Sequence, residues 1–78
     1  MKNNTRLIRM MTEFVSTGIR AKRPVQEMEG EFASLYDEDE RFEDLQYALA
    51  MYDGTEENHR ALITECKWAL RVLTEAKS

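Results

Sequence analysis

The 78-residue sequence contains one cysteine, one histidine and one proline. A lone Cys66 excludes an intrachain disulfide and a cysteine-based zinc site, because both need several thiols. No apolar run approaches the roughly 20 residues that span a bilayer. Arg6 and Arg9 interrupt the first apolar segment, so no signal peptide is expected. These absences predict a reduced, cytoplasmic protein.

The sequence also lacks the patterns of common catalytic and metal sites. His59 is the only histidine, and no motif places a nucleophile or an orienting group beside it. Cys66 falls at core spacing, which predicts a buried, unreactive thiol. There is no glycine-rich phosphate loop, and the acidic run 37–40 lacks the alternating ligands and the glycine of a calcium loop. We therefore expect no catalytic residue, no metal and no cofactor, and infer that the protein is not an enzyme.

The spacing of apolar residues predicts an all-α protein. A chain this short is expected to form one domain, residues 1–78, which buries about 60% of its unfolded surface. Apolar residues recur at helical spacing throughout, without strand-like alternation. We predict a compact antiparallel bundle of four helices. The predicted helices cover residues 5–19, 24–36, 41–52 and 56–76.

Glycine, proline and threonine mark the expected helix boundaries. At Gly18 either another backbone passes close by or the first helix ends. Pro24 is well suited to the first position of the second helix. Gly54 can take the left-handed conformation that ends the third helix, and Thr55 can cap the fourth.

Each predicted helix has an apolar stripe that we expect to face the core. The stripes are Leu7, Ile8, Met11, Phe14, Val15 and Ile19; Val25, Met28, Phe32, Leu35 and Tyr36; Phe42, Leu45, Leu49 and Tyr52; and Leu62, Ile63, Cys66, Ala69, Leu70 and Leu73. Trp68 falls close to the opposite face of its helix. It is therefore either covered by a second neighbour or exposed to solvent.

Charge is segregated along the chain. Residues 1–23 carry a net charge of +5, residues 24–57 carry −11, and residues 58–78 carry +2. The acidic block is expected to repel nucleic acid and to attract basic partners. The alternative is that the acids provide solubility and that the basic first segment folds against them.

The acids are densest where the third helix is expected to begin. Asp37 or Asp39 can cap this helix. Asp44, Tyr47 and Met51 share its outer face, where Tyr47 is either an interface anchor within a charged rim or a contact to a neighbouring helix. The candidate partner-binding residues are Asp37, Glu38, Asp39, Glu40, Glu43, Asp44 and Tyr47.

The first part of the chain resembles a family of bacterial proteins. A Phe-x-x-x-Gly-Ile step at 14–19 is followed by a spaced aromatic pair, Phe32 and Tyr36, which leads into the acidic turn 37–40. Over about residues 7–53 this is similar to small immunity proteins of the colicin D and self-protective colicin-like type. The resemblance implies a monomer that binds the basic cytotoxic domain, commonly a nuclease, of a bacteriocin or contact-dependent toxin. Carboxylates would then stand in for phosphates.

Two other functions remain open from the sequence. The protein could be a small helical regulatory or adaptor protein, as a homodimer, whose acidic surface serves only solubility. It could instead be a nucleic-acid-binding module that uses the basic residues Arg6, Arg9, Arg20, Lys22 and Arg23. No aromatic residue is interleaved with the cations at 20–23, which disfavours single-strand binding.

Overall fold

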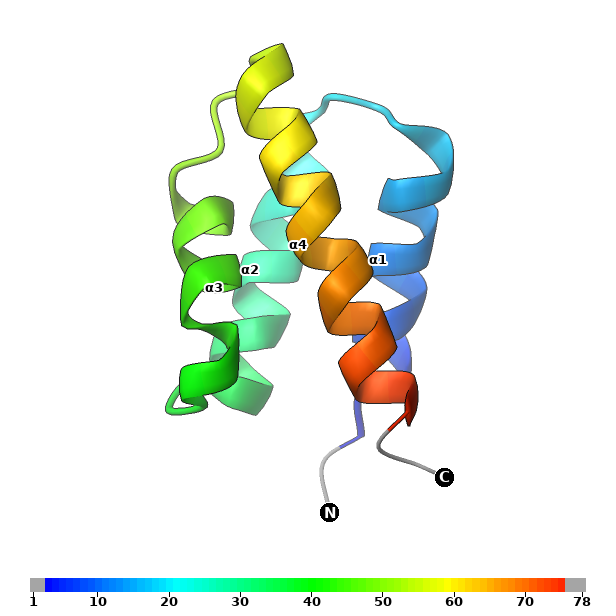
Figure 1. Ribbon diagram of the computed structural model, residues 1–78, viewed down its shortest axis with the longest axis vertical. Helices are drawn as coiled ribbons and strands as arrows, with labels where there is room; N and C mark the ends of the chain where they lie inside the picture. Colours follow the sequence, from blue (N-terminus) through cyan, green and yellow to red (C-terminus); the bar gives the residue numbers. More distant parts are fainter. Residues whose placement is uncertain (1–2, 76–78) are drawn as a thin grey trace.

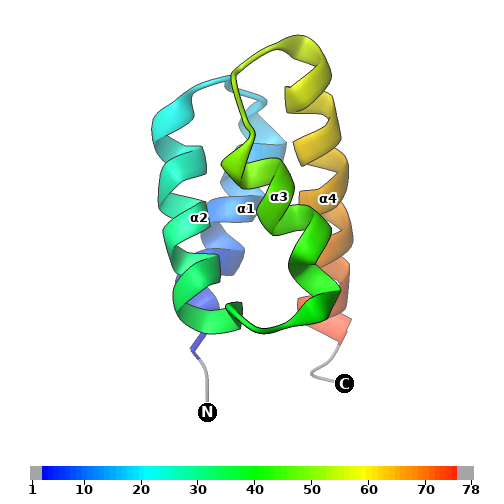
Figure 2. The same ribbon diagram turned by 90° about the vertical axis from the view of Figure 1, so that its left-hand side faces the viewer.

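The computed structural model describes residues 3–75, which form four α-helices and one short 3-10 helix (Figure 1). The elements are α1 (Thr5–Thr17), α2 (Lys22–Tyr36), η1 (Glu40–Phe42), α3 (Glu43–Ala50) and α4 (Glu56–Glu75). Successive helices run in opposite directions, and each packs against two others, in the order α1, α2, α3, α4 and back to α1 (Figures 1 and 2). The predicted antiparallel bundle of four helices is confirmed.

The first helix ends earlier than predicted. Gly18 has φ 66°, in the left-handed region, and its N–H donates to the Phe14 carbonyl at 3.1 Å. No described heavy atom lies within 4 Å of a Cβ atom added at Gly18. The position therefore favours glycine because of its backbone conformation and not because another backbone passes close by. The chain turns away from the core here, so Ile19, predicted in the apolar stripe, is 59% exposed.

The second helix begins earlier than predicted, at Lys22 instead of Pro24. Pro24 is then in the first turn, where a missing N–H removes no intrahelical hydrogen bond. The predicted end of the last helix, Ala76, lies outside the described residues.

The third helix was predicted as one segment, 41–52, and this is wrong at both ends. The segment begins with the tighter turn η1, whose cap is Asp39: its Oδ1 accepts a hydrogen bond from the Arg41 N–H at 3.0 Å. The α-helix proper ends at Ala50. Tyr52 is nevertheless buried, as predicted.

The core is filled by apolar side chains from every helix. The buried residues are Leu7, Met11, Phe14, Val25, Met28, Phe32, Tyr36, Phe42, Leu45, Leu49, Tyr52, Leu62, Cys66, Ala69 and Leu73. Ile8, Val15, Leu35, Ile63 and Leu70 pack half-buried against them. The predicted stripes are therefore confirmed except at Ile19, and no polar or charged residue among 3–75 is buried.

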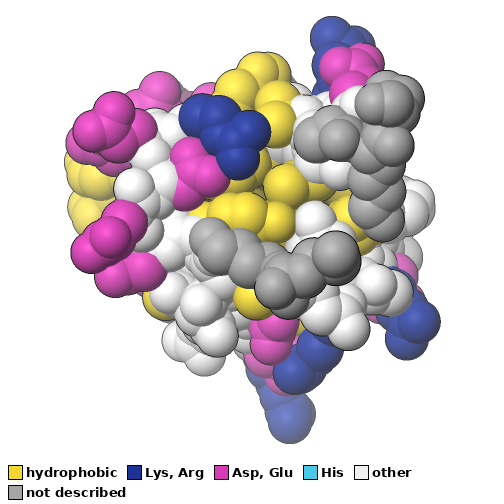
Figure 3. Space-filling model, turned by 90° about the horizontal axis from the view of Figure 1, so that it is seen from below, with side chains coloured by type: hydrophobic (Ala, Val, Ile, Leu, Met, Phe, Trp, Pro, Cys, Tyr) yellow, Lys and Arg dark blue, Asp and Glu magenta, His cyan; other side chains and the backbone are white. Residues whose placement is uncertain are grey.

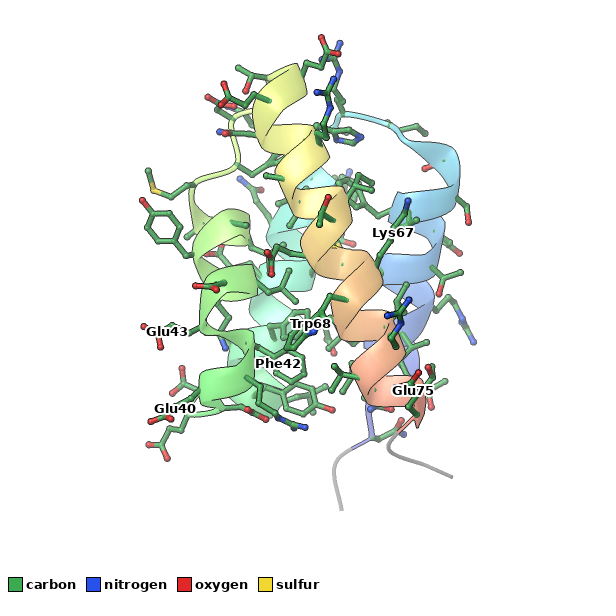
Figure 4. All side chains as sticks on the ribbon, viewed as in Figure 1. Glu40, Phe42, Glu43, Lys67, Trp68 and Glu75 are labelled. Carbon is green, nitrogen blue, oxygen red and sulfur yellow. The ribbon has the colours of Figure 1, made fainter. Side chains whose placement is uncertain are left out.

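An aromatic cluster fills the end of the bundle where α2 leads into α3. The Phe42 ring centroid lies 5.4 Å from Phe32, 5.1 Å from Tyr36 and 5.7 Å from Trp68. Figure 4 shows Trp68 reaching from α4 toward Phe42. Trp68 is 42% exposed, so it lies between the two predicted alternatives, with one edge against the core and the rest in solvent. Phe42 thus joins α2, η1 and α4.

His59 belongs to the packing at the other end of the bundle. Its Nδ1 lies 3.0 Å from the Tyr52 hydroxyl, and its ring centroid lies 5.2 Å from that of Phe14. Burial raises the pKa of Tyr52, so the hydroxyl stays neutral. The contacts tie α4 to α1 and to the loop after α3.

The loop between α3 and α4 is held by hydrogen bonds to Asp53. Its Oδ1 accepts from the Thr55 N–H at 3.0 Å, from the Thr55 hydroxyl at 2.7 Å and from the Asn58 amide at 2.9 Å. Gly54 has φ 81°, the predicted left-handed conformation, but the prediction that it ends the third helix is wrong, because α3 already ends at Ala50. The Thr55 hydroxyl in turn accepts from the Asn58 N–H at 3.3 Å, which confirms the predicted cap of α4.

We expect Asp53→Ala to destabilise the protein at neutral pH and to have less effect in acid. The hydrogen bonds from Thr55, and then from Asn58, lower the pKa of Asp53 below its ordinary value of 3.8. Folding favours the charged form of Asp53. Its contribution to the free energy of unfolding is therefore fully present above the pKa of the unfolded state and is lost as the pH falls through the lower pKa of the folded state. The measurement is the urea unfolding midpoint of the wild type and of Asp53→Ala, from neutral pH to a pH below the pKa of Asp53.

Asp37→Ala is the control variant, because Asp37 is exposed in the turn between α2 and η1 and its side chain accepts no hydrogen bond from residues 3–75. A difference between wild type and Asp53→Ala that stays unchanged in strong acid would contradict the prediction.

Candidate functional site

The turn between α2 and α3 brings acidic residues together at one end of the bundle. An open depression of about 320 Å³ is lined by Asp37, Glu38, Asp39, Glu40, Glu43 and Gln46. Seen from this end, acidic side chains gather at one side of the molecule (Figure 3). Most of the predicted partner-binding residues therefore share one surface. Gln46 was not predicted to belong to it.

Asp39 differs from its acidic neighbours because it is engaged within the fold. Its carboxylate forms a two-pronged ion pair with Arg41, with Oδ1 at 3.0 Å from Nε and Oδ2 at 2.7 Å from one terminal nitrogen. The Asp39 side chain is only 18% exposed. Hydrogen bonding to Asp39 raises the pKa of Arg41, whose guanidinium lies 5.2 Å from the centre of the Phe42 ring. Asp39 therefore has a structural role: it stabilises the turn between α2 and α3.

We expect Asp39→Ala to lower the free energy of unfolding by about 1 kcal/mol, the usual effect of losing a helix cap. The Arg41 N–H loses its acceptor, and the guanidinium loses its carboxylate. The measurement is urea unfolding followed by circular dichroism. Asp37→Ala in the same turn should leave stability nearly unchanged. Equal effects of the two substitutions would contradict the assignment.

Glu40, Glu43 and Asp44 are the acids of η1 and α3 whose charge is available to a partner, as is that of Asp37 and Glu38 in the preceding turn. All five are exposed, and none forms an ion pair within residues 3–75. Figure 4 shows Glu40 and Glu43 pointing into solvent from η1 and α3. Acidic side chains near a helix N-terminus interact favourably with the helix dipole, so these residues also stabilise α3.

Tyr47 continues the same surface along α3. It is 68% exposed, so the alternative that it packs against a neighbouring helix is wrong. Leu45 and Leu49 point into the core, which places Tyr47 on the opposite face. Met51, 57% exposed, donates its N–H to the Tyr47 carbonyl at 3.0 Å, so the two residues are one helical turn apart on one face.

Helix α3, which carries this surface, is held in place by a hydrogen bond to α2 and by its packing against the core. The Gln46 amide donates to the Tyr36 carbonyl at 2.9 Å and ties α3 to the end of α2. Leu45 and Leu49 anchor the inner face in the core. The exposed side chains therefore stand on a rigid support. The hydrogen bond from Gln46 to α2 was not predicted, because the sequence pattern does not distinguish this glutamine from an ordinary exposed residue of a helix.

The basic residues of the first segment do not form a single unpaired patch. Arg6 pairs with Glu31 at 3.1 Å, and Arg23 lies 3.8 Å from Glu27. The Arg6–Glu31 pair joins α1 to α2, which agrees with the expectation that the basic segment folds against the acidic middle, whereas the Arg23–Glu27 contact lies within α2.

The structure gives no group arranged for metal binding among residues 3–75. Cys66 is buried, and burial raises the pKa of its thiol to about 12. A thiol with such a pKa is protonated at neutral pH and is a poor nucleophile.

Comparison with protein-family models, curated proteins and solved structures finds no match to this chain. In the part that the structure describes, no helix has both the length and the apolar character required to cross a membrane.

Proposed function

We propose that this protein is an immunity-type inhibitor that binds and neutralises a basic cytotoxic domain. The observation that carries the proposal is the surface formed by Glu40, Glu43 and Asp44 beside the exposed Tyr47 on a rigid helix. In the complex, these carboxylates occupy the positions that the phosphates of a substrate would take. One inhibitor binds one basic domain.

Electrostatics supports a basic partner. A nuclease surface carries positive potential to hold phosphates. A segment with a net charge of −11 over residues 24–57 steers such a surface into contact and raises the association rate. Four acids of this segment pair with arginines, namely Glu27, Glu31, Asp39 and Glu56. No ion pair within residues 3–75 involves Asp37, Glu38, Glu40, Glu43 or Asp44, so the acidic end of the bundle keeps its charge.

The sequence resemblance supports a toxin domain as that partner. Residues 7–53 resemble immunity proteins of the colicin D and self-protective colicin-like type. Proteins of this kind act in the cytoplasm of the producing cell, where the toxin would otherwise be active. The proposal needs no catalytic residue in this chain.

A helical adaptor that forms homodimers is the second candidate. It is favoured by the exposed apolar side chains of Tyr47 and Met51, which could meet their counterparts on another copy. This function predicts a solution mass that rises with concentration and does not need a basic partner.

The test is capture from native cell extract at low salt with the tagged protein as bait. We expect a stoichiometric basic protein that is released when salt is raised, and that loses its toxic or nuclease activity when the bait is added back. Retention of the bait's own copies alone would overturn the inhibitor proposal and favour the adaptor. A retained protein that resists high salt would contradict the charge mechanism.

A further inference from the structure

The outer face of α3 carries an apolar strip that the bundle itself does not use. The strip consists of Tyr47, Ala50 and Met51, all exposed. Large exposed hydrophobic side chains elsewhere in residues 3–75 are Ile19 and Trp68, which stand on different elements. Single exposed hydrophobics are common on protein surfaces, whereas a contiguous pair on one helix turn is a candidate contact surface.

The strip is bounded by negative charge at its N-terminal side. Asp44 and Glu43 lie three and four residues before Tyr47, so they are its neighbours on the helix surface. Glu40 is one turn further along the same side, in η1. An occupant of the strip must therefore bring positive charge to the edge of its apolar contact.

A second copy of the chain fits this requirement poorly. A two-fold symmetric contact pairs the same patch on both subunits. In a parallel α3–α3 contact the Glu43 and Asp44 carboxylates of the two copies would face each other. In an antiparallel contact they would lie toward the Met51 end of the other α3, where the next charged residue in sequence is again an acid, Asp53. Like charges that face each other repel, so the charge pattern favours a basic partner over self-association.

We propose that the α3 strip is the anchor of the inhibitor's interface. Tyr47 inserts into an apolar recess of the basic partner, Met51 covers the side of that recess, and Lys or Arg residues around it meet Glu40, Glu43 and Asp44. This inference rests on the proposed function and adds the form of the partner's surface, namely an apolar recess with a cationic rim.

Two features prepare the strip for this contact. The Met51 N–H donates to the Tyr47 carbonyl, and Gln46 ties the same helix to α2, so little backbone ordering is required on binding. Tyrosine also offers a large contact area with few rotatable bonds.

The carboxylates and the strip are expected to affect different rate constants. Exposed rim charges act mainly on association and on its salt dependence. A desolvated aromatic anchor acts mainly on dissociation. The proposal therefore predicts that the two sets of substitutions give separable kinetic effects.

The experiment uses the full-length protein as bait in the same extract, and then measures binding to the captured basic protein by surface plasmon resonance at low and at physiological salt. We expect Tyr47→Ala to increase the dissociation rate by about 10- to 100-fold with an unchanged salt dependence. Tyr47→Phe keeps the ring and should retain most of the binding. Ile19→Ala, which truncates an exposed apolar residue elsewhere, is the matched control and should behave as wild type.

The outcomes separate the two proposals. If wild type captures a salt-released basic protein and Tyr47→Ala dissociates at the wild-type rate, the anchor inference is overturned and the inhibitor proposal stands. If wild type captures no basic protein, the inhibitor proposal fails and the anchor inference fails with it. Self-association that Tyr47→Ala abolishes would identify a second copy as the occupant and would also overturn the inference. Unchanged circular dichroism spectra of the variants exclude misfolding as the cause.

Discussion

Replacing Glu40, Glu43 and Asp44 together with lysine is expected to lower the association rate with the basic partner by about 10- to 1000-fold. The substitutions reverse the charge of three exposed acids on η1 and α3 that have no ion pair within residues 3–75. They leave Asp39 and its bond to Arg41 in place, so the turn keeps its cap. The measurement is the association rate at several salt concentrations, which should be nearly independent of salt in the variant.

The control is the triple variant Glu13→Lys, Glu27→Lys and Glu57→Lys. It changes the net charge by the same amount but alters exposed residues of α1, α2 and α4. At physiological ionic strength charges are screened over about 8 Å, so distant acids contribute much less than those at the contact. An equal loss of association in both triple variants would show that overall charge, and not this surface, governs binding.

Phe42→Ala is expected to lower the free energy of unfolding by about 3–5 kcal/mol. Phe42 is fully buried, and its ring packs against Phe32, Tyr36 and Trp68, so the substitution opens a cavity between three elements. Small domains have a total stability of about 5–15 kcal/mol, so the variant should be close to unfolding at ambient temperature. Urea unfolding by circular dichroism and by Trp68 fluorescence measures the loss.

Two further substitutions test whether the cavity causes this loss. Phe42→Leu keeps most of the apolar volume and should be clearly more stable than Phe42→Ala. Ile19→Ala removes an exposed side chain and should change stability by no more than about 0.5 kcal/mol. A Phe42→Ala protein as stable as Phe42→Leu would contradict the central packing role of this ring.

The helical pattern predicted the bundle and most of its core because burial follows the period of the helix. It failed at Ile19 because the helical spacing of apolar residues extends beyond Gly18, whereas the left-handed backbone at Gly18 ends the helix and redirects the chain. The segment 41–52 was predicted as regular helix because periodicity does not distinguish a 3-10 turn from an α-helical one. The preference of Asp39 for the Arg41 N–H determines that turn.

The candidate surface was predicted only in part. The acidic residues are adjacent in sequence, so their grouping follows from the chain itself. The exposure of Tyr47 could not be predicted from the sequence. Each helix in a bundle contacts two neighbours, and the sequence does not reveal which of its faces the neighbouring helices cover. The two-pronged bond between Asp39 and Arg41 depends on side-chain conformation, which the spacing of residues does not reveal.

The order in which the helices pack has a consequence for how the chain folds. Of the four main helix–helix contacts among residues 3–75, the α1–α2, α2–α3 and α3–α4 contacts join sequence neighbours, and the α1–α4 contact closes over a long stretch of chain. Proteins dominated by such local contacts fold in microseconds to milliseconds, because little loop entropy is lost before favourable contacts form. A newly synthesised molecule would therefore reach its native state rapidly. If the protein is the inhibitor proposed above, rapid folding shortens the time before it can bind its toxin.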